Sequence, residues 1–172
     1  MDMDLTPAQQ ELQEELEAVR HNLPVGGYET SIGELLSSYE DGNLIIAPDK
    51  PGAHDINKEQ KTRIIENLLI GLSAPSITVL MDKTGRYELI EGEQWLKTLF
   101  QFMGKIETRY SFRMENPRIL KSAAGFAWSE DSFSKTPKKF LSVHQRTDLK
   151  RVRVKLNIIA SRDNQPVREY YN

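Results

Sequence analysis

The segment 91–95 contains the residues with the clearest capacity for chemistry. It reads Glu91-Gly92-Glu93-Gln94-Trp95, so two carboxylates flank a glycine. Two carboxylates that converge can hold a metal ion or position water for attack on a phosphate ester. Two acids at the start of a helix are also favoured by the helix dipole alone. Glu91 and Glu93 are therefore either a catalytic pair or a stabilised helix start, and the sequence leaves both readings open.

Outside residues 91–95, the sequence offers few side chains for catalysis or metal binding. The chain has no cysteine, which excludes disulfides, thiolate metal sites and cysteine nucleophiles. Its histidines, His21, His54 and His144, are too far apart in sequence to form a paired zinc motif, so no metal site is predicted. Trp95 could stack on a nucleic-acid base, but a tryptophan followed by Leu96 is more typical of a core or interface position.

The densest positive stretch lies in the last third of the chain. On a strand expected over 151–159, Arg151, Arg153 and Lys155 alternate with apolar residues and so share one face. That face could bind nucleic acid, or it could be a solvated surface on which lysine discourages aggregation. The whole stretch comprises Lys135, Lys138, Lys139, Arg146, Lys150, Arg151, Arg153 and Lys155.

Length and composition place these residues in a small protein of mixed structure. The chain has 172 residues, 38% of them hydrophobic, and a formal net charge of −2, which gives no general attraction to nucleic acid or to an anionic membrane. No apolar run approaches the roughly 20 residues that a membrane span needs. The acidic N-terminus is unlike a secretory signal. We therefore expect a cytoplasmic protein without membrane association.

Helix and strand signals are clear in the first 103 residues. Thr6 and Pro7 open a helix with a narrow apolar stripe, which lies on its own domain or packs on a partner. Gly26 and Gly27 indicate a breaker over 22–28, so residues 1–29 are expected to form an N-terminal helix and linker. The sequence further predicts a helix over 30–39, a turn at 41–42, a strand over 44–46, a loop over 48–55, a helix from Asn57 to Gly71, a hairpin of strands 77–81 and 87–90, and a helix over 93–103.

Signals are weaker beyond residue 104. The sequence predicts a strand over 109–113, a loop over 122–136, a helix from Pro137 through Phe140 and Leu141, a strand over 151–159 and the start of a helix over 166–171. The strands near 44–46, 77–81, 87–90 and 151–159 should join one small mixed sheet flanked by helices, which is an α+β fold.

The order of elements over 58–103 resembles a known family. A helix ends at Gly71, Pro75 precedes a hairpin, and an acidic-Gly turn at Glu91-Gly92 opens a second helix. This order resembles the ParB/sulfiredoxin-like superfamily, in particular the domain of unknown function 262 found at the N-terminus of GmrSD-type modification-dependent restriction systems. The resemblance extends over residues 30–172 and implies a ParB-like domain whose C-terminal helix is cut short.

The resemblance also implies a phosphate site. The family carries Asp-Gly-Gln-Gln-Arg at the position of residues 91–95, and its glycine presents backbone amides at a helix N-terminus, where phosphate is favoured. Gly92 and Gln94 match this motif and are expected to bind nucleotide or phosphate. Arg63 matches an arginine of the preceding helix and is a further candidate for phosphate binding, although it could equally form a structural ion pair. The Gln-Arg pair that the family carries near the end of its first strand is absent, and Lys50 is the candidate cation in its place.

The chain departs from the motif in a way that disfavours catalysis. Glu93 replaces an amide and Trp95 replaces the arginine, so the site loses one positive charge and gains one negative charge. Unit charges about 4 Å apart interact by about 4 kcal/mol at an effective dielectric constant near 20. The leading expectation is therefore a degenerate binding module for a protein partner or nucleic acid, without efficient catalysis or a cofactor. The alternative is a nucleotide-hydrolysing or DNA-cleaving domain of a bacterial defence system, which would use Mg²⁺ and a nucleoside triphosphate.

Both ends of the chain suggest a partner. The apolar stripe Leu12, Leu16 and Val19 of the N-terminal helix could pack on a second copy. A helix over 166–171 is too short to be stable by itself. We therefore expect a protein partner or a homo-oligomer formed through the N-terminal helix or the C-terminal end, with nucleic acid as a second class of partner.

Overall fold

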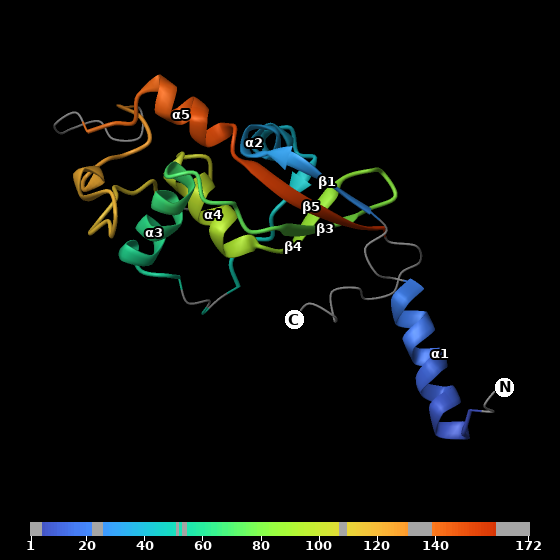
Figure 1. Cartoon of the computed structure of the whole chain (residues 1–172). Coiled ribbons are helices and arrows are strands. Elements are labelled where there is room, and N and C mark those ends of the chain that lie inside the picture. The colour runs from blue at the N-terminus through green and yellow to red at the C-terminus, as the bar shows by residue number, and fades with distance from the viewer. Residues whose placement is uncertain are drawn as a thin grey trace.

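The computed structural model describes residues 5–21, 26–50, 52, 55–106, 110–130 and 139–160. Within these ranges, helices and strands alternate along much of the chain (Figure 1). The helices are α1 (Pro7–His21), α2 (Ile32–Glu40), α3 (Lys58–Leu69), α4 (Glu93–Phe102), the short 3-10 helix η1 (Lys121–Ala123) and α5 (Val143–Lys150). The strands are β1 (Gly26–Ser31), β2 (Leu44–Ile45), β3 (Ile77–Met81), β4 (Tyr87–Glu91) and β5 (Arg153–Ala160).

The strands form one five-stranded sheet in the order β1-β5-β3-β4-β2. The pairs β1–β5 and β3–β4 are antiparallel, whereas β3–β5 and β2–β4 are parallel, so the sheet is mixed. The prediction of a small mixed sheet with helices is therefore confirmed, as is the prediction that segments near 44–46, 77–81, 87–90 and 151–159 share it. The ParB-like identity of this α+β fold stays a prediction.

The edge strand β1 corrects the expectation of a breaker over 22–28, which is wrong for residues 26–28. Gly26 and Gly27 pair with Ile158 and Asn157 of β5. A Cβ atom at Gly27 would lie 2.6 Å from the carbonyl oxygen of Leu156, so the close approach of the two strands requires glycine there. β1 also runs through residues 29 and 30, between which the sequence predicted the boundary of the N-terminal helix and linker with the ParB-like domain.

Helix α5 begins later than predicted. Ser142 caps it, accepting a hydrogen bond from the backbone N–H of Gln145 while the Gln145 side chain accepts one from the N–H of Ser142. Phe140 instead forms an isolated bridge with Ala127, so the predicted helix is wrong for Phe140 and Leu141. Pro137 lies outside the described residues.

Three further predictions concern the second half of the chain. Residues 110–113 have no regular structure, so the predicted strand is wrong there. Residue 109, residues 131–136 of the predicted loop and the helix predicted over 166–171 lie outside the described part of the chain.

The hydrophobic core lies between the sheet and the helices other than α1. Ile32 of α2, Ile65 of α3, Val79 of β3 and Phe100 of α4 are fully buried within it. Trp95 is 7% exposed and belongs to the same core, which favours the core reading of this residue over base stacking. The buried side chains of α4 thus fix the position of the helix, and with it the position of its N-terminus.

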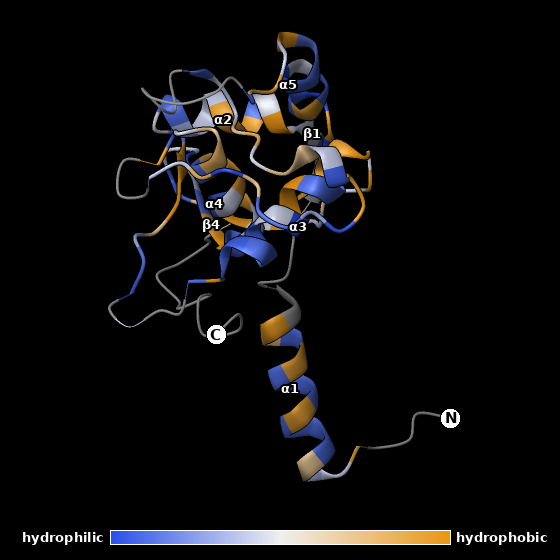
Figure 2. Ribbon diagram, turned by 90° about the vertical axis from the view of Figure 1, so that its left-hand side faces the viewer, coloured by the Kyte–Doolittle hydropathy of each residue, from blue (hydrophilic) through white to orange (hydrophobic). Residues whose placement is uncertain are grey.

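Helix α1 stands away from the rest of the chain in both views (Figures 1 and 2). Apolar positions interrupt its polar surface in Figure 2, and Leu12 and Leu16 are 56% and 37% exposed. The structure therefore favours an exposed stripe over a helix lying on its own domain. No helix among the described residues combines the length and apolar character needed to cross a membrane.

Candidate functional site

The turn between β4 and α4 is built around Gly92. This residue is the N-cap of α4 and adopts a left-handed backbone conformation with φ +88°. A Cβ atom there would lie 2.8 Å from Cγ2 of Ile77, so both the backbone angle and the surrounding space favour glycine. The helix has no side-chain cap, and its first backbone N–H groups are the amides that the predicted phosphate site would use.

The two candidate catalytic carboxylates on either side of Gly92 contact different groups. Oε2 of Glu91 accepts a hydrogen bond of 2.8 Å from the hydroxyl of Thr78 in β3. Oε2 of Glu93 lies 3.5 Å from Nζ of Lys97, one turn further along α4. Among the described residues, no group of three or more acidic, histidine or cysteine side chains could hold a metal ion. This arrangement favours separate structural roles for Glu91 and Glu93.

Lys97 is the central charged residue of this region. Its Nζ lies 3.1 Å from Oδ1 of Asp49, in addition to its contact with Glu93, and its side chain is only 11% exposed. Two carboxylates therefore surround one largely buried ammonium group. Sequence reasoning missed this cluster, although the spacing of Glu93 and Lys97 is that of a helical ion pair.

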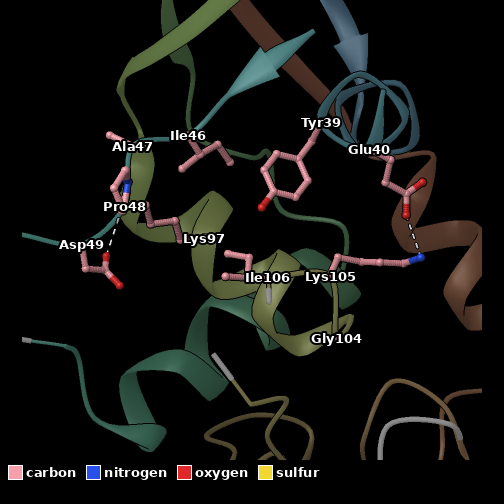
Figure 3. Close-up of a pocket in the computed structure, with 10 residues that line it drawn as sticks. All are labelled: Tyr39, Glu40, Ile46, Ala47, Pro48, Asp49, Lys97, Gly104, Lys105 and Ile106. Carbon is pink, nitrogen blue, oxygen red and sulfur yellow. Dashed lines mark hydrogen bonds and ion pairs between the residues drawn. The ribbon is translucent and has the colours of Figure 1, made fainter. Parts of the chain in front are cut away.

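A cavity of about 580 Å³ lies beside Lys97 (Figure 3). Tyr39 at the end of α2, Ile46 after β2 and Ile106 after α4 supply much of its apolar wall. Lys105 pairs with Glu40 at 2.7 Å on one side of the cavity, and Asp49 pairs with Lys97 on another (Figure 3). Because both lysines are paired with carboxylates, an anionic ligand would have to compete with those acids.

The residues predicted to bind phosphate occupy three separate elements. Gly92 and Gln94 lie together at the start of α4, Arg63 is exposed on α3, and Lys50 is exposed in the segment after β2. No hydrogen bond or ion pair joins any two of these described residues, and none of them lines the cavity beside Lys97. The structure thus shows the amides at the start of α4 but no direct contact between Gln94 and either candidate cation, Arg63 or Lys50.

The basic face predicted on the last strand is divided between two elements. Arg151 is the C-cap of α5, whereas Arg153 and Lys155 lie on β5 and are exposed. Nε of Arg153 lies 3.9 Å from Oε2 of Glu29 on β1, and Lys155 is opposite Glu29 in the strand register. Glu29 therefore offsets part of the positive charge on this face.

A second basic cluster lies on α5. The guanidinium carbon of Arg146 and Nζ of Lys150 lie 6.0 Å and 5.9 Å from the ring centre of Trp128. Trp128 is 6% exposed, and the three side chains line a cavity of about 280 Å³ together with Val143 and Thr147. Within the described ranges, no ion pair joins Arg146 or Lys150 to a carboxylate.

Of the three histidines, only the side chain of His144 is described, and it lines neither cavity. His144 is exposed on α5 and lies 3.5 Å from Asp148, while the side chains of His21 and His54 lie outside the described part of the structure.

We compared the chain with protein-family models, with curated proteins and with solved structures, and none of them matches it. The resemblance to ParB-like domains consequently rests on the sequence motifs alone.

Proposed function

We propose that this chain is a cytoplasmic ParB-like binding module that binds nucleic acid along α5 and the start of β5 and does not hydrolyse nucleotides. One observation carries the proposal. Arg146 and Lys150 stand one helical turn apart over the ring of Trp128, and neither is paired with a carboxylate in the described structure. These two cations, with Arg151, Arg153 and Lys155, form what we call the basic track.

The chemistry of the basic track suits a phosphate backbone. Two neighbouring cations repel each other, and a phosphate placed between them would relieve that repulsion while releasing bound counterions. The indole ring of Trp128 stabilises both cations in place through cation–π contact. Because the whole chain carries a net charge of −2, the attraction would be confined to this surface.

The surroundings of Gly92 support binding without hydrolysis. The ammonium of Lys97 is shared by Asp49 and Glu93. Trp95 occupies the motif position of the family's arginine. Its indole ring is uncharged and buried, so this position supplies no cation to a phosphate. An excess of carboxylates would repel a triphosphate at the start of α4.

Fluorescence anisotropy with labelled single- and double-stranded oligonucleotides tests the binding proposal. We expect binding at low ionic strength that weakens steeply as salt increases. Reversing both charges in Arg146→Glu/Lys150→Glu should reduce affinity by roughly a hundredfold or more, since each of the two hydrogen bonds to a charged group contributes about 1.5–3 kcal/mol and about 1.4 kcal/mol is a factor of ten.

The variant Lys50→Glu/Arg63→Glu is the matched comparison, because it changes the net charge equally at the positions implied by the family resemblance. It should bind within about threefold of the wild type once general electrostatics are allowed for. No binding at low salt, or a larger loss in this variant than in Arg146→Glu/Lys150→Glu, would contradict the proposal.

Phosphate release from ATP, GTP and CTP, with Mg²⁺ and with or without DNA, tests the absence of hydrolysis. We expect no multiple turnover above background. Turnover that disappears in Glu91→Ala would instead support the alternative, a nucleotide hydrolase with a variant site.

A further inference from the structure

Helix α1 has the length and surface of a helix that needs a partner. It spans 15 residues, and isolated helices of about this length are only marginally stable in water. It stands away from the sheet and the other helices in both views (Figures 1 and 2), so the core contributes little to its stability. Its leucines remain exposed, at 56% for Leu12 and 37% for Leu16.

The apolar stripe of α1 has the spacing of a coiled-coil seam. Leu12, Leu16 and Val19 recur at intervals of four and three residues, which places them on alternating d and a positions of a heptad. The two edges of this seam differ in charge. Glu15 lies at a g position on one edge, with Glu11 on the same side of the helix, whereas Gln13 lies at an e position on the other edge and Gln9 continues the seam at an a position.

We propose that α1 pairs in parallel and in register with α1 of a second copy of this chain. In a parallel pair the edges of opposite kind meet, so the glutamate edge of each helix faces the glutamine edge of its partner. In an antiparallel pair, like edges meet, and the glutamates of both helices would repel each other.

The charge pattern also makes two copies of α1 complementary to each other, so no other protein is needed to complete the pair. Each α1 supplies the edge that the other one requires, which is the self-complementarity of an interface with two-fold symmetry. The seam within the described helix is short, so the dimer should be weak and concentration-dependent rather than obligate.

The absence of cysteine from the sequence allows a direct test in the whole 172-residue chain. Val19→Cys places a thiol on the seam, and Gln10→Cys places one on the opposite side of α1 as the matched control. Under mild oxidation, we expect Val19→Cys to form a disulfide-linked dimer at least tenfold faster than Gln10→Cys. Adding Leu12→Asp to Val19→Cys should abolish this advantage.

Light scattering over a range of concentrations gives a readout without cysteine. The wild-type mass should rise from 19.8 kDa toward twice that value, while Leu12→Asp/Leu16→Asp remains monomeric. Equal oxidation rates for Val19→Cys and Gln10→Cys, or a monomer at every concentration, would overturn the proposal. Faster cross-linking in a mixture of Leu12→Cys and Val19→Cys chains than in either alone would show antiparallel pairing and would also overturn it.

Discussion

The ammonium group of Lys97 lies 3.1 Å from the carboxylate of Asp49, although the two residues are 48 positions apart in the chain. This contact ties the first half of α4 to the segment after β2. Both residues line the cavity of about 580 Å³, so the ion pair also helps to define one of its walls.

Replacing Lys97 by methionine should destabilise the protein by about 1–3 kcal/mol. Methionine fills most of the buried volume, but Asp49 and Glu93 would lose the cation between them. Their side chains are 38% and 40% exposed, and the water they retain limits the cost. Urea unfolding would measure the change. Lys83→Met in the exposed turn is the control and should stay within about 0.5 kcal/mol. Equal effects of the two substitutions would contradict a stabilising role for the cluster.

Gly92→Ala should be clearly more destabilising than Gly85→Ala. Both glycines have left-handed backbones, with φ of +88° and +84°, so both substitutions pay a similar conformational cost of about 1–2 kcal/mol. A methyl group at Gly85 meets nothing within 4 Å, whereas at Gly92 it meets Cγ2 of Ile77 at 2.8 Å. We expect an additional cost of about 1–3 kcal/mol for Gly92→Ala from this overpacking. Thermal and urea unfolding of the two variants would reveal the difference, and equal losses would rule out the steric part of the explanation.

Local sequence signals predicted the elements around Gly92 well. Asn57 caps α3 through a capping box with Gln60, and the predicted hairpin of strands 77–81 and 87–90 forms, with a turn at 83–85 between its strands. These features depend on residues a few positions apart, so propensity and spacing suffice to locate them.

Contacts between distant segments could not be predicted in the same way. Lys97 has an ordinary helical ion pair in Glu93, but its burial depends on Asp49 in a segment without regular structure. Arg146 and Lys150 were recognised as basic residues, whereas their shared contact with Trp128 depends on how the chain before α5 folds back. The pairing of β1 with β5 joins segments more than 120 residues apart, and neither carries a local signal for the other.

Glu66 shows how strongly a distant segment can determine the role of one side chain. It lies on α3, is 1% exposed, and accepts backbone hydrogen bonds from Arg118, Ile119 and Leu120. Glu66→Gln should destabilise the protein by about 1–3 kcal/mol, because an amide group would face a backbone donor that then lacks an acceptor. Urea unfolding at neutral pH would measure this loss. Glu130→Gln, an exposed acid, is the control and should have little effect. A loss no larger than that of the control would contradict this role.

The stabilising effect of Glu66 should also depend on pH. Burial raises the pKa of this carboxyl, but hydrogen bonds from the backbone of Leu120, Ile119 and Arg118, aided by the charge of Lys121, outweigh burial and leave the pKa below its usual value. The folded state therefore binds this proton less readily than the unfolded state, so the contribution is complete above the ordinary glutamate pKa of about 4.3. It is lost as the pH falls through the lower pKa of the folded state. The pKa of Asp82 is also lowered, to about 2, chiefly by a hydrogen bond from the Thr84 hydroxyl, but Asp82 is present in both proteins and cancels from their difference.

Urea unfolding of wild type and Glu66→Gln, from neutral pH down to about pH 3, isolates the contribution of Glu66. Glutamine does not titrate, so the difference in unfolding free energy between the two proteins should be constant near neutrality and should shrink as the medium becomes more acidic than the ordinary glutamate pKa. A difference that stayed constant down to the lowest pH would mean that Glu66 keeps the same pKa in both states. A difference that grew on acidification would require a raised pKa in the folded protein, and burial would then outweigh the three backbone hydrogen bonds.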